Sequence, residues 1–228
     1  EKSLELNVTE NLLRELRKYM QFNNAFSYGL TLRQEAAIGL DISINLPSQA
    51  RVFGLQFKKP ISCKYNQIYR FKINNNIKRD QHLKLYYLSL IFHYIFQRDF
   101  IYYSFPCFFD TKQLASSSPN FLKRTFFVNP RVMPIRILDT NIHVVQIDSI
   151  SARVDIFSNF GKEIEVIRGD KFIENILRQE SFIEVGTLME KCKRIEKKYL
   201  IKVLEESKAQ PILFKLLEEN WYIRIRCI

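Results

Sequence analysis

Residues 40–59, LDISINLPSQARVFGLQFKK, decide the fold of this 228-residue chain. Apolar and polar side chains alternate over residues 40–46, which predicts a strand with its aliphatic side chains on one face and Asp41 on the other. After a proline-serine turn, residues 51–59 predict a second, largely apolar strand. If the two strands pair as a hairpin, polar side chains of the second strand approach Asp41.

Four polar residues on or near this hairpin suit metal-assisted cleavage of a phosphodiester bond. Gln56 and Lys58 are two positions apart and share one strand face, and Glu35 could reach the same place from a short helical turn before Asp41. Mg²⁺ binds hard oxygen ligands, so we expect metal ligation by Asp41, Gln56, Glu35 and the backbone carbonyl of Phe57. Lys58 would orient or help to deprotonate the attacking water, or stabilise charge on the phosphate.

Elements predicted on either side make this an α/β (α+β) protein with a mixed central sheet flanked by helices. Apolar periodicity predicts a helix over residues 9–22, with Thr9 as its N-cap, and a long helix over residues 79–98. We expect further strands at residues 69–73, 101–105, 135–138, 143–148, 153–157 and 221–227, and a further helix at residues 187–206. Residues 111–134 have no regular pattern.

The hairpin residues and this element order resemble the PD-(D/E)XK superfamily of restriction-endonuclease-like nucleases. The resemblance covers residues 12–105 and implies a core with the order helix, three strands, helix, strand. It places Asp41 at the metal-binding aspartate, Gln56 at the position of the second acid, Lys58 at the lysine and Glu35 at the helical acid. Gln81 and Tyr86 resemble a Gln/Tyr pair of some exonuclease-type members, with a spacing one residue longer.

Two features depart from that pattern. Leu40 stands where the family has a proline, which many members lack. Gln56 removes one negative charge and should weaken the affinity for a divalent ion unless Glu35 compensates. Members with Gln at this position and an active site are known, and a binding-only member of the fold remains open as an alternative.

Positive charge is concentrated around the same residues. The chain carries a formal net charge of +11, and residues 42–98 hold ten basic side chains and one acidic side chain, Asp80. A segment this one-sided attracts polyanions. The predicted nucleic-acid contacts are Lys59, Arg70, Lys72, Lys78, Arg79, Gln81 and His82.

These observations predict a Mg²⁺- or Mn²⁺-dependent endonuclease that hydrolyses DNA. Residues 1–110 would form the nuclease-like core, and residues 111–228 would pack on it as an extension with a β-hairpin and helices that could support a homodimer. No stretch is apolar and long enough for a membrane-spanning helix, so we expect a cytoplasmic protein, in the host cytoplasm if the source is viral rather than archaeal. The alternatives are a catalytically inactive nucleic-acid-binding protein on the same fold, and a protein-interaction or membrane-surface module that uses the basic face.

Overall fold

The computed structural model describes residues 2–29, 40–46, 51–73, 81–82, 85–86, 89–90, 93, 99–133, 143–157, 162–163 and 166–178. The chain divides into two compact units, residues 1–182 and 183–228, and the second unit lies outside the described residues. Several predictions therefore fall on residues that the structure does not describe. They concern Glu35, Lys78, Arg79 and the elements expected at residues 135–138, 187–206 and 221–227.

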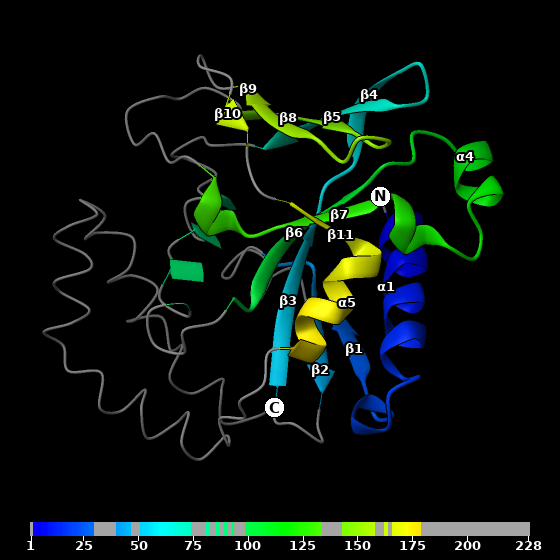
Figure 1. Ribbon diagram of the computed structural model, residues 1–228, viewed down its shortest axis with the longest axis vertical. Coiled ribbons are helices and arrows are strands. Elements are labelled where there is room, and N and C mark those ends of the chain that lie inside the picture. The colour runs from blue at the N-terminus through cyan, green and yellow to red at the C-terminus, as the bar shows by residue number, and fades with distance from the viewer. Residues whose placement is uncertain are drawn as a thin grey trace, which may run out of the picture. The chain divides into compact units, whose positions relative to one another are not determined.

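A six-stranded mixed sheet forms the centre of the first unit (Figure 1). Its strand order is β1-β2-β3-β6-β7-β11; β3 and β6 run parallel, and every other neighbouring pair is antiparallel. The strands are β1 (Phe26–Gly29), β2 (Ile42–Leu46), β3 (Arg51–Phe57), β6 (Ile101–Pro106), β7 (Thr125–Val128) and β11 (Ile167–Arg168).

A second, five-stranded sheet is antiparallel throughout, with the order β10-β9-β8-β5-β4. Its strands are β4 (Pro60–Lys64), β5 (Ile68–Ile73), β8 (His143–Asp148), β9 (Val154–Phe157) and β10 (Lys162–Glu163). The chain passes from the first sheet into the second through Lys58 and Lys59, which join β3 to β4. The rings of Phe71 and Phe105, 5.0 Å apart between centroids, pack the two sheets together.

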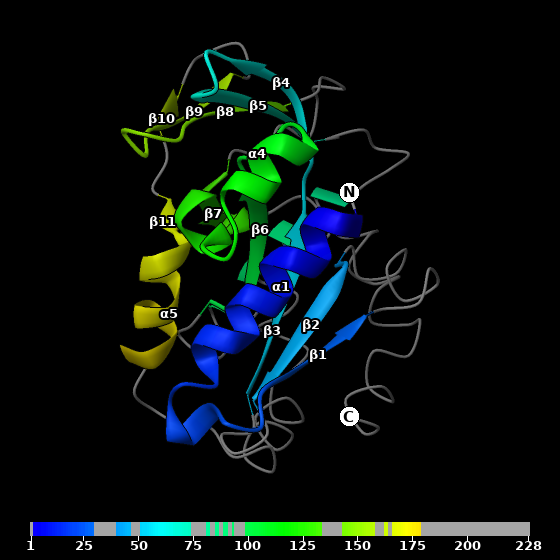
Figure 2. The ribbon, with the colours of Figure 1, turned by 90° about the vertical axis from the view of Figure 1, so that its right-hand side faces the viewer.

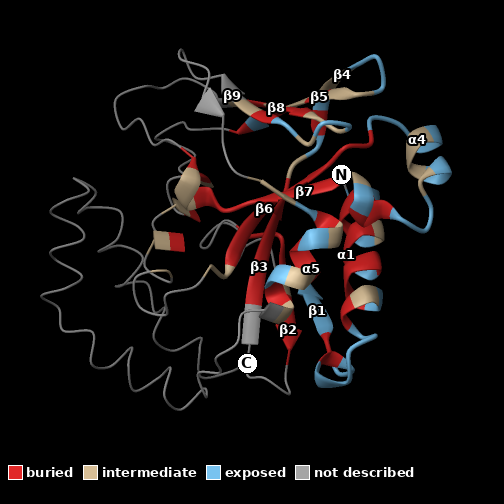
Figure 3. Cartoon of the chain, viewed as in Figure 1, coloured by how far each residue is buried: buried red, intermediate tan, exposed pale blue. Residues whose placement is uncertain are grey.

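Helices cover one face of the six-stranded sheet. The helical elements are α1 (Lys2–Leu16), η1 (Met20–Phe22), α4 (Thr111–Ser116), η4 (Phe121–Arg124), η5 (Pro130–Val132) and α5 (Gly169–Arg178). Figure 2 shows α1 in front of the central strands, with α5 to its left. One apolar cluster joins Leu12 and Leu16 of α1 to Ile44 of β2, Leu55 of β3 and Phe172 of α5. Figure 3 shows these facing surfaces as buried.

The opposite face of the sheet contacts residues that belong to the predicted long helix. Residues 81–82, 85–86, 89–90 and 93 are helical, which agrees with the helix expected over residues 79–98. His82 contacts Tyr103 of β6, and Ser89 donates a hydrogen bond to Asn129 just after β7. One face of the sheet packs on α1 and the other on the segment that contains His82. The residues of β2 and β3 that point toward α1 are apolar, whereas Asp41 and Gln56 lie on the other face.

The predicted mixed α/β architecture is confirmed, and three details of its elements were wrong. The strand expected at residues 69–73 exists as β5, but it pairs in the second sheet, and β1 occupies the first position in the central sheet. Thr9 is not an N-cap, because α1 begins at Lys2 and buries Thr9 within it. Residues 111–134 are not irregular, since they include α4 and β7.

Strands from both sides of residue 110 pair within each sheet. In the central sheet β6 pairs with β7, and in the second sheet β5 pairs with β8 over six residue pairs. The hairpin expected after residue 111 is present as the antiparallel pair β8 and β9. The two halves of the described chain therefore share their hydrogen-bonded ladders.

Candidate active site

Asp41 and Gln56 meet on the face of the central sheet that points away from α1, where β2 begins and β3 ends. Gln56 Nε2 donates a hydrogen bond to Asp41 Oδ2 at 2.8 Å, and the backbone N–H of Phe57 donates to the same oxygen at 2.7 Å. Both side chains are buried, with 8% of Asp41 and 3% of Gln56 exposed. The antiparallel register of β2 and β3 creates this meeting, because Ile42 lies opposite Leu55 and the Asp41 N–H donates to the Leu55 carbonyl.

Gln81 connects Gln56 to Lys58. Gln81 Nε2 donates to Gln56 Oε1 at 2.8 Å, and Lys58 Nζ donates to Gln81 Oε1 at 2.7 Å. The result is a continuous hydrogen-bonded chain from Asp41 through two amides to the ammonium group. A chain of this kind fixes each side chain in one orientation, so Lys58 is connected to the carboxylate through two amides.

Tyr103 and His82 pack next to this chain of polar groups. Gln56 lies opposite Tyr103 in the parallel register of β3 and β6, and Lys58 Nζ lies 5.7 Å from the Tyr103 ring centroid. The Tyr103 hydroxyl is 3.0 Å from His82 Nδ1. Burial raises the pKa of Tyr103 well above its usual value, so its hydroxyl stays protonated at physiological pH.

Gly54 of β3 leaves space for a neighbouring side chain beside the site. A Cβ atom on Gly54 would lie 2.3 Å from Leu40 Cδ1, closer than packed atoms approach. Leu40 is buried immediately before Asp41. Gly54 therefore leaves room for the Leu40 side chain, which is buried next to Asp41.

Two oxygens at this site converge on one point. Gln56 Nε2 donates to Asp41 Oδ2 at 2.8 Å and also to the Phe57 carbonyl oxygen at 3.2 Å. Rotating the Gln56 amide by half a turn would replace this nitrogen with Oε1 and bring three oxygens together. Such a carboxylate, amide and carbonyl set suits a partly hydrated Mg²⁺ or Mn²⁺ ion.

Gln56 is neutral, so it adds no charged ligand to the site. Among the described residues, no three His, Cys, Asp or Glu side chains gather closely enough to hold a metal ion. Glu35, the second predicted acid, lies outside the described ranges. The described part of the site thus offers a single carboxylate, that of Asp41, with neutral oxygens.

The predicted nucleic-acid contacts divide into exposed and buried residues. Lys59 and Lys72 are exposed, and Arg70 is half-buried with its Nε 2.9 Å from Gln146 Oε1. Gln81 is half-buried in the hydrogen-bonded chain described above. His82 was wrongly predicted as a surface contact, because its side chain is fully buried against Tyr103.

Sequence reasoning did not place Gln81 and Tyr103 in one cluster with Gln56 and Lys58. Tyr103 lies in an apolar strand whose sequence does not show which face bears the site. Only the parallel pairing of β3 with β6 sets Tyr103 opposite Gln56. All six residues of β6 are buried, so its sequence carries no signal for the face that bears the site.

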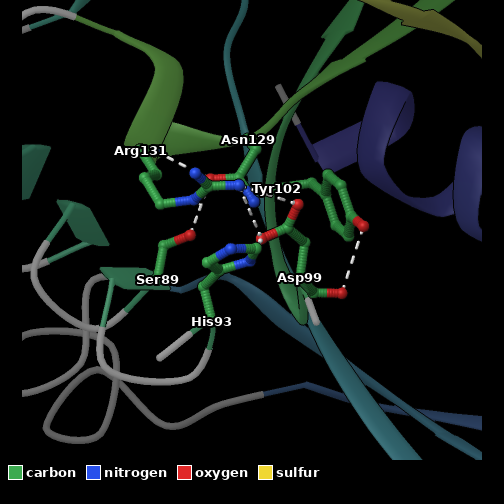
Figure 4. Close-up of polar contacts among 6 residues, drawn as sticks. All are labelled: Ser89, His93, Asp99, Tyr102, Asn129 and Arg131. Carbon is green, nitrogen blue, oxygen red and sulfur yellow. Dashed lines mark hydrogen bonds and ion pairs between the residues drawn. The ribbon is translucent and has the colours of Figure 1, made fainter. Parts of the chain in front are cut away.

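A second polar cluster lies around the start of β6 (Figure 4). Asp99 accepts hydrogen bonds from Arg131 Nη2 at 3.4 and 3.5 Å, and its Oδ1 lies 3.1 Å from His93 Nδ1. Ser89 Oγ donates to Asn129 Oδ1 at 2.6 Å. These contacts tie the helix that contains Ser89 and His93 to β6 and to the segment after β7.

No family model, curated protein or solved structure matches this chain. Within the described ranges, no helix has the length and apolar character needed to span a bilayer.

Proposed function

We propose that this chain is a metal-dependent nuclease of the PD-(D/E)XK type that hydrolyses phosphodiester bonds in DNA. The observation that carries the proposal is the convergence of Asp41, Gln56 and Lys58, three residues that the sequence pattern had selected, in one hydrogen-bonded cluster. Their approach depends on the pairing of β2 with β3 and on Gln81 from a segment 23 residues beyond Lys58.

The element order of the central sheet supports the same proposal. A helix, α1, is followed by the three antiparallel strands β1, β2 and β3, then by a helical segment and by β6. This is the order helix, three strands, helix, strand of the superfamily's core. The β4–β5 pair is inserted between the third strand and the second helix.

Asp41, the Phe57 carbonyl and a rotated Gln56 amide would hold the Mg²⁺ or Mn²⁺ ion. A bound divalent ion polarises the phosphate and lowers the pKa of a coordinated water. Rotation of the Gln56 amide would turn its Nε2 toward Gln81 Nε2, so Gln81 would rotate as well and release Lys58 Nζ. The ammonium would then orient the water and stabilise negative charge that develops on the phosphate. The basic segment of residues 58–73, which contains five Lys and Arg and no Asp or Glu, attracts the DNA backbone to the site.

One observation favours a second candidate, a nucleic-acid-binding protein without catalysis. The Gln56 amide donates to Asp41 and to Phe57, so it occupies the place that a metal would need. A buried site whose polar groups are hydrogen-bonded in this way is stable without a metal. The two candidates differ in whether Gln56 rotates when a divalent ion is supplied.

Cleavage assays separate the candidates. Purified protein is incubated with supercoiled plasmid, linear duplex and single-stranded DNA in Mg²⁺, Mn²⁺, Ca²⁺ or EDTA, and the products are resolved on gels. The proposal expects cleavage in Mg²⁺ or Mn²⁺ and none in EDTA. DNA binding without cleavage in every divalent ion would instead establish the binding-only protein.

A further inference from the structure

The turn between β4 and β5 has an unusual backbone conformation. Tyr65 and Asn66 both have φ of 53°, and the Gln67 N–H donates to the Lys64 carbonyl at 3.0 Å. Two consecutive central residues with positive φ favour glycine and asparagine, and a bulky residue is rare there. Asn66 suits its position, whereas Tyr65 occupies a conformation that strains its backbone.

Burial does not compensate Tyr65 for this strain. Its side chain is 91% exposed at the end of the hairpin. The ring therefore gains little from packing within the chain. An exposed aromatic residue in a strained position is a candidate for an external contact.

The backbone below Tyr65 is nevertheless held firmly. The Asn66 carbonyl accepts hydrogen bonds from the Tyr69 hydroxyl at 3.2 Å and from Arg124 Nη2 at 3.4 Å. Asn66 Oδ1 accepts from Gln113 Nε2 at 2.9 Å. These bonds anchor the turn to η4 and α4, so the ring projects from a rigid support.

One face of the same hairpin carries cations. Alternate residues of β5 point inward, where Tyr69 and Phe71 are buried, while Arg70 and Lys72 lie on the outer face. The register places Ser62 opposite Arg70 and Lys64 opposite Ile68, so Lys64 lies on this outer face as well. We call the outer surface formed by Lys59, Lys64, Tyr65, Arg70 and Lys72 the hairpin face.

We propose that the hairpin face binds DNA that contains unpaired bases. Its cations contact backbone phosphates, and Tyr65 stacks on one unpaired base. Duplex DNA offers the phosphates but keeps its bases stacked on one another, so it satisfies the cations without engaging the ring. The inference deepens the proposed function by naming single-stranded or branched DNA as the substrate class, while the binding itself requires no catalysis.

The chain length between Lys58 and Tyr65 limits where the stacked base lies. Seven residues of extended chain span at most about 24 Å. That distance corresponds to about seven nucleotides at about 3.4 Å per stacked nucleotide. A stacked strand that runs directly from Lys58 to Tyr65 would therefore place the stacked base within about seven nucleotides of the bond that faces Lys58.

Equilibrium binding in EDTA tests the inference separately from cleavage. The probe is a 20-nucleotide single strand carrying 2-aminopurine, and the duplex of the same sequence is its comparison. The wild-type protein is expected to quench 2-aminopurine in the single strand. Tyr65→Gly is expected to abolish the quenching and weaken single-strand binding about 5- to 150-fold, while duplex binding changes little.

Matched variants guard against loss of folding. Tyr65→Gly relieves the positive φ, so its melting temperature should rise while its single-strand affinity falls. Tyr65→Phe should bind as the wild type, because it keeps the ring. Tyr28→Ala, which removes a half-exposed ring from β1, is the control and should leave the affinity unchanged.

The charged residues have a separate readout. Replacing Lys64 and Lys72 together by Ala should lower the salt dependence of single-strand binding by about 0.7 in the log–log slope for each lost phosphate contact. Lys171→Ala on α5 should not change this slope.

Two results would overturn the inference. One is that Tyr65→Gly binds the single strand as tightly as the wild type does, and the other is that the wild type binds RNA of the same sequence more tightly than DNA. Loss of binding in Tyr65→Gly, with no cleavage by the wild type in any divalent ion, would uphold it and refute only the nuclease.

Discussion

The side-chain amide of Gln56 donates to the carboxylate of Asp41 across the β2–β3 ladder, with Nε2 and Oδ2 2.8 Å apart. The two residues are 15 positions apart in sequence and both are buried. In this orientation the amide supplies the carboxylate with a hydrogen bond in the absence of a cation. The same orientation must change before Gln56 can offer its oxygen to a metal.

Gln56→Glu should convert the site to one that depends on metal for stability. Two adjacent buried carboxylates repel each other, so the free energy of unfolding in EDTA should fall by about 1–3 kcal/mol. Added Mn²⁺ should raise the melting temperature of Gln56→Glu more than that of the wild type, because binding to the folded state stabilises it. Thermal melts with and without Mn²⁺ measure both effects, and equal metal-induced shifts in the two proteins would contradict the assigned ligand position.

Gln81→Ala should impair catalysis more than binding. The change removes the acceptor of Lys58 Nζ and the donor to Gln56 Oε1, so both side chains lose their orientation. Loss of such supporting groups typically lowers activity about 10- to 100-fold. Single-turnover cleavage and DNA affinity are compared with those of Lys112→Ala, an exposed residue on α4. A proportional loss of affinity would mean that Gln81 contacts DNA instead.

Gly169→Ala should destabilise the fold far more than Gly29→Ala. A Cβ atom at Gly169 would lie 2.4 Å from the backbone oxygen of Leu122 in η4, whereas nothing lies within 4 Å of one at Gly29. Overpacking of this kind costs about 1–3 kcal/mol, while an exposed change stays within about 0.5 kcal/mol. Urea denaturation of both variants measures the difference, and equal losses would refute the packing of α5 against η4.

Asp148 should make the stability of the protein depend on acid pH. Partial burial raises the pKa of Asp148, but hydrogen bonds from the Ile150 and Ser151 N–H groups and from Gln67 outweigh it and hold the pKa below its usual value. A lowered native pKa stabilises the fold at pH values above the unfolded value of about 3.9, and this stabilisation is lost as the pH falls through the native pKa.

Asp148→Asn should therefore be less stable than the wild type at neutral pH, with the difference shrinking between about pH 5 and pH 2. Urea denaturation of both proteins across this range provides the measurement. A difference that stays constant with pH would show that the charge of Asp148 contributes nothing to the fold.

The sequence predicted β2, β3, β6 and β8 well, because each has either clear alternation or an apolar run that ends at a turn. It failed for β1, whose four residues are all exposed and carry no burial pattern. It also failed for β7, where four consecutive buried residues are too few to distinguish a strand from a loop. The start of α1 was misjudged because Leu4 and Val8 extend the buried stripe before Thr9.

The candidate site was predictable only as far as the hairpin determines it. The two-residue spacing of Gln56 and Lys58 and the alternation around Asp41 follow from strand geometry. The bridging position of Gln81 and the burial of His82 depend on how a helix packs on β6. A local sequence pattern does not predict that packing. Neighbouring helical residues point about 100° apart, so Gln81 can reach Lys58 while His82 enters the core.

The most direct test of the central claim is the single-turnover rate of Mn²⁺-dependent DNA cleavage by wild type and by Asp41→Asn, measured at saturating protein. Glu10→Gln, an exposed change on α1, is the matched control. We predict that the wild type and Glu10→Gln cleave at the same rate, while Asp41→Asn retains DNA binding and cleaves at least about 100-fold more slowly. Cleavage by Asp41→Asn at the wild-type rate would contradict the claim that this site carries the reaction.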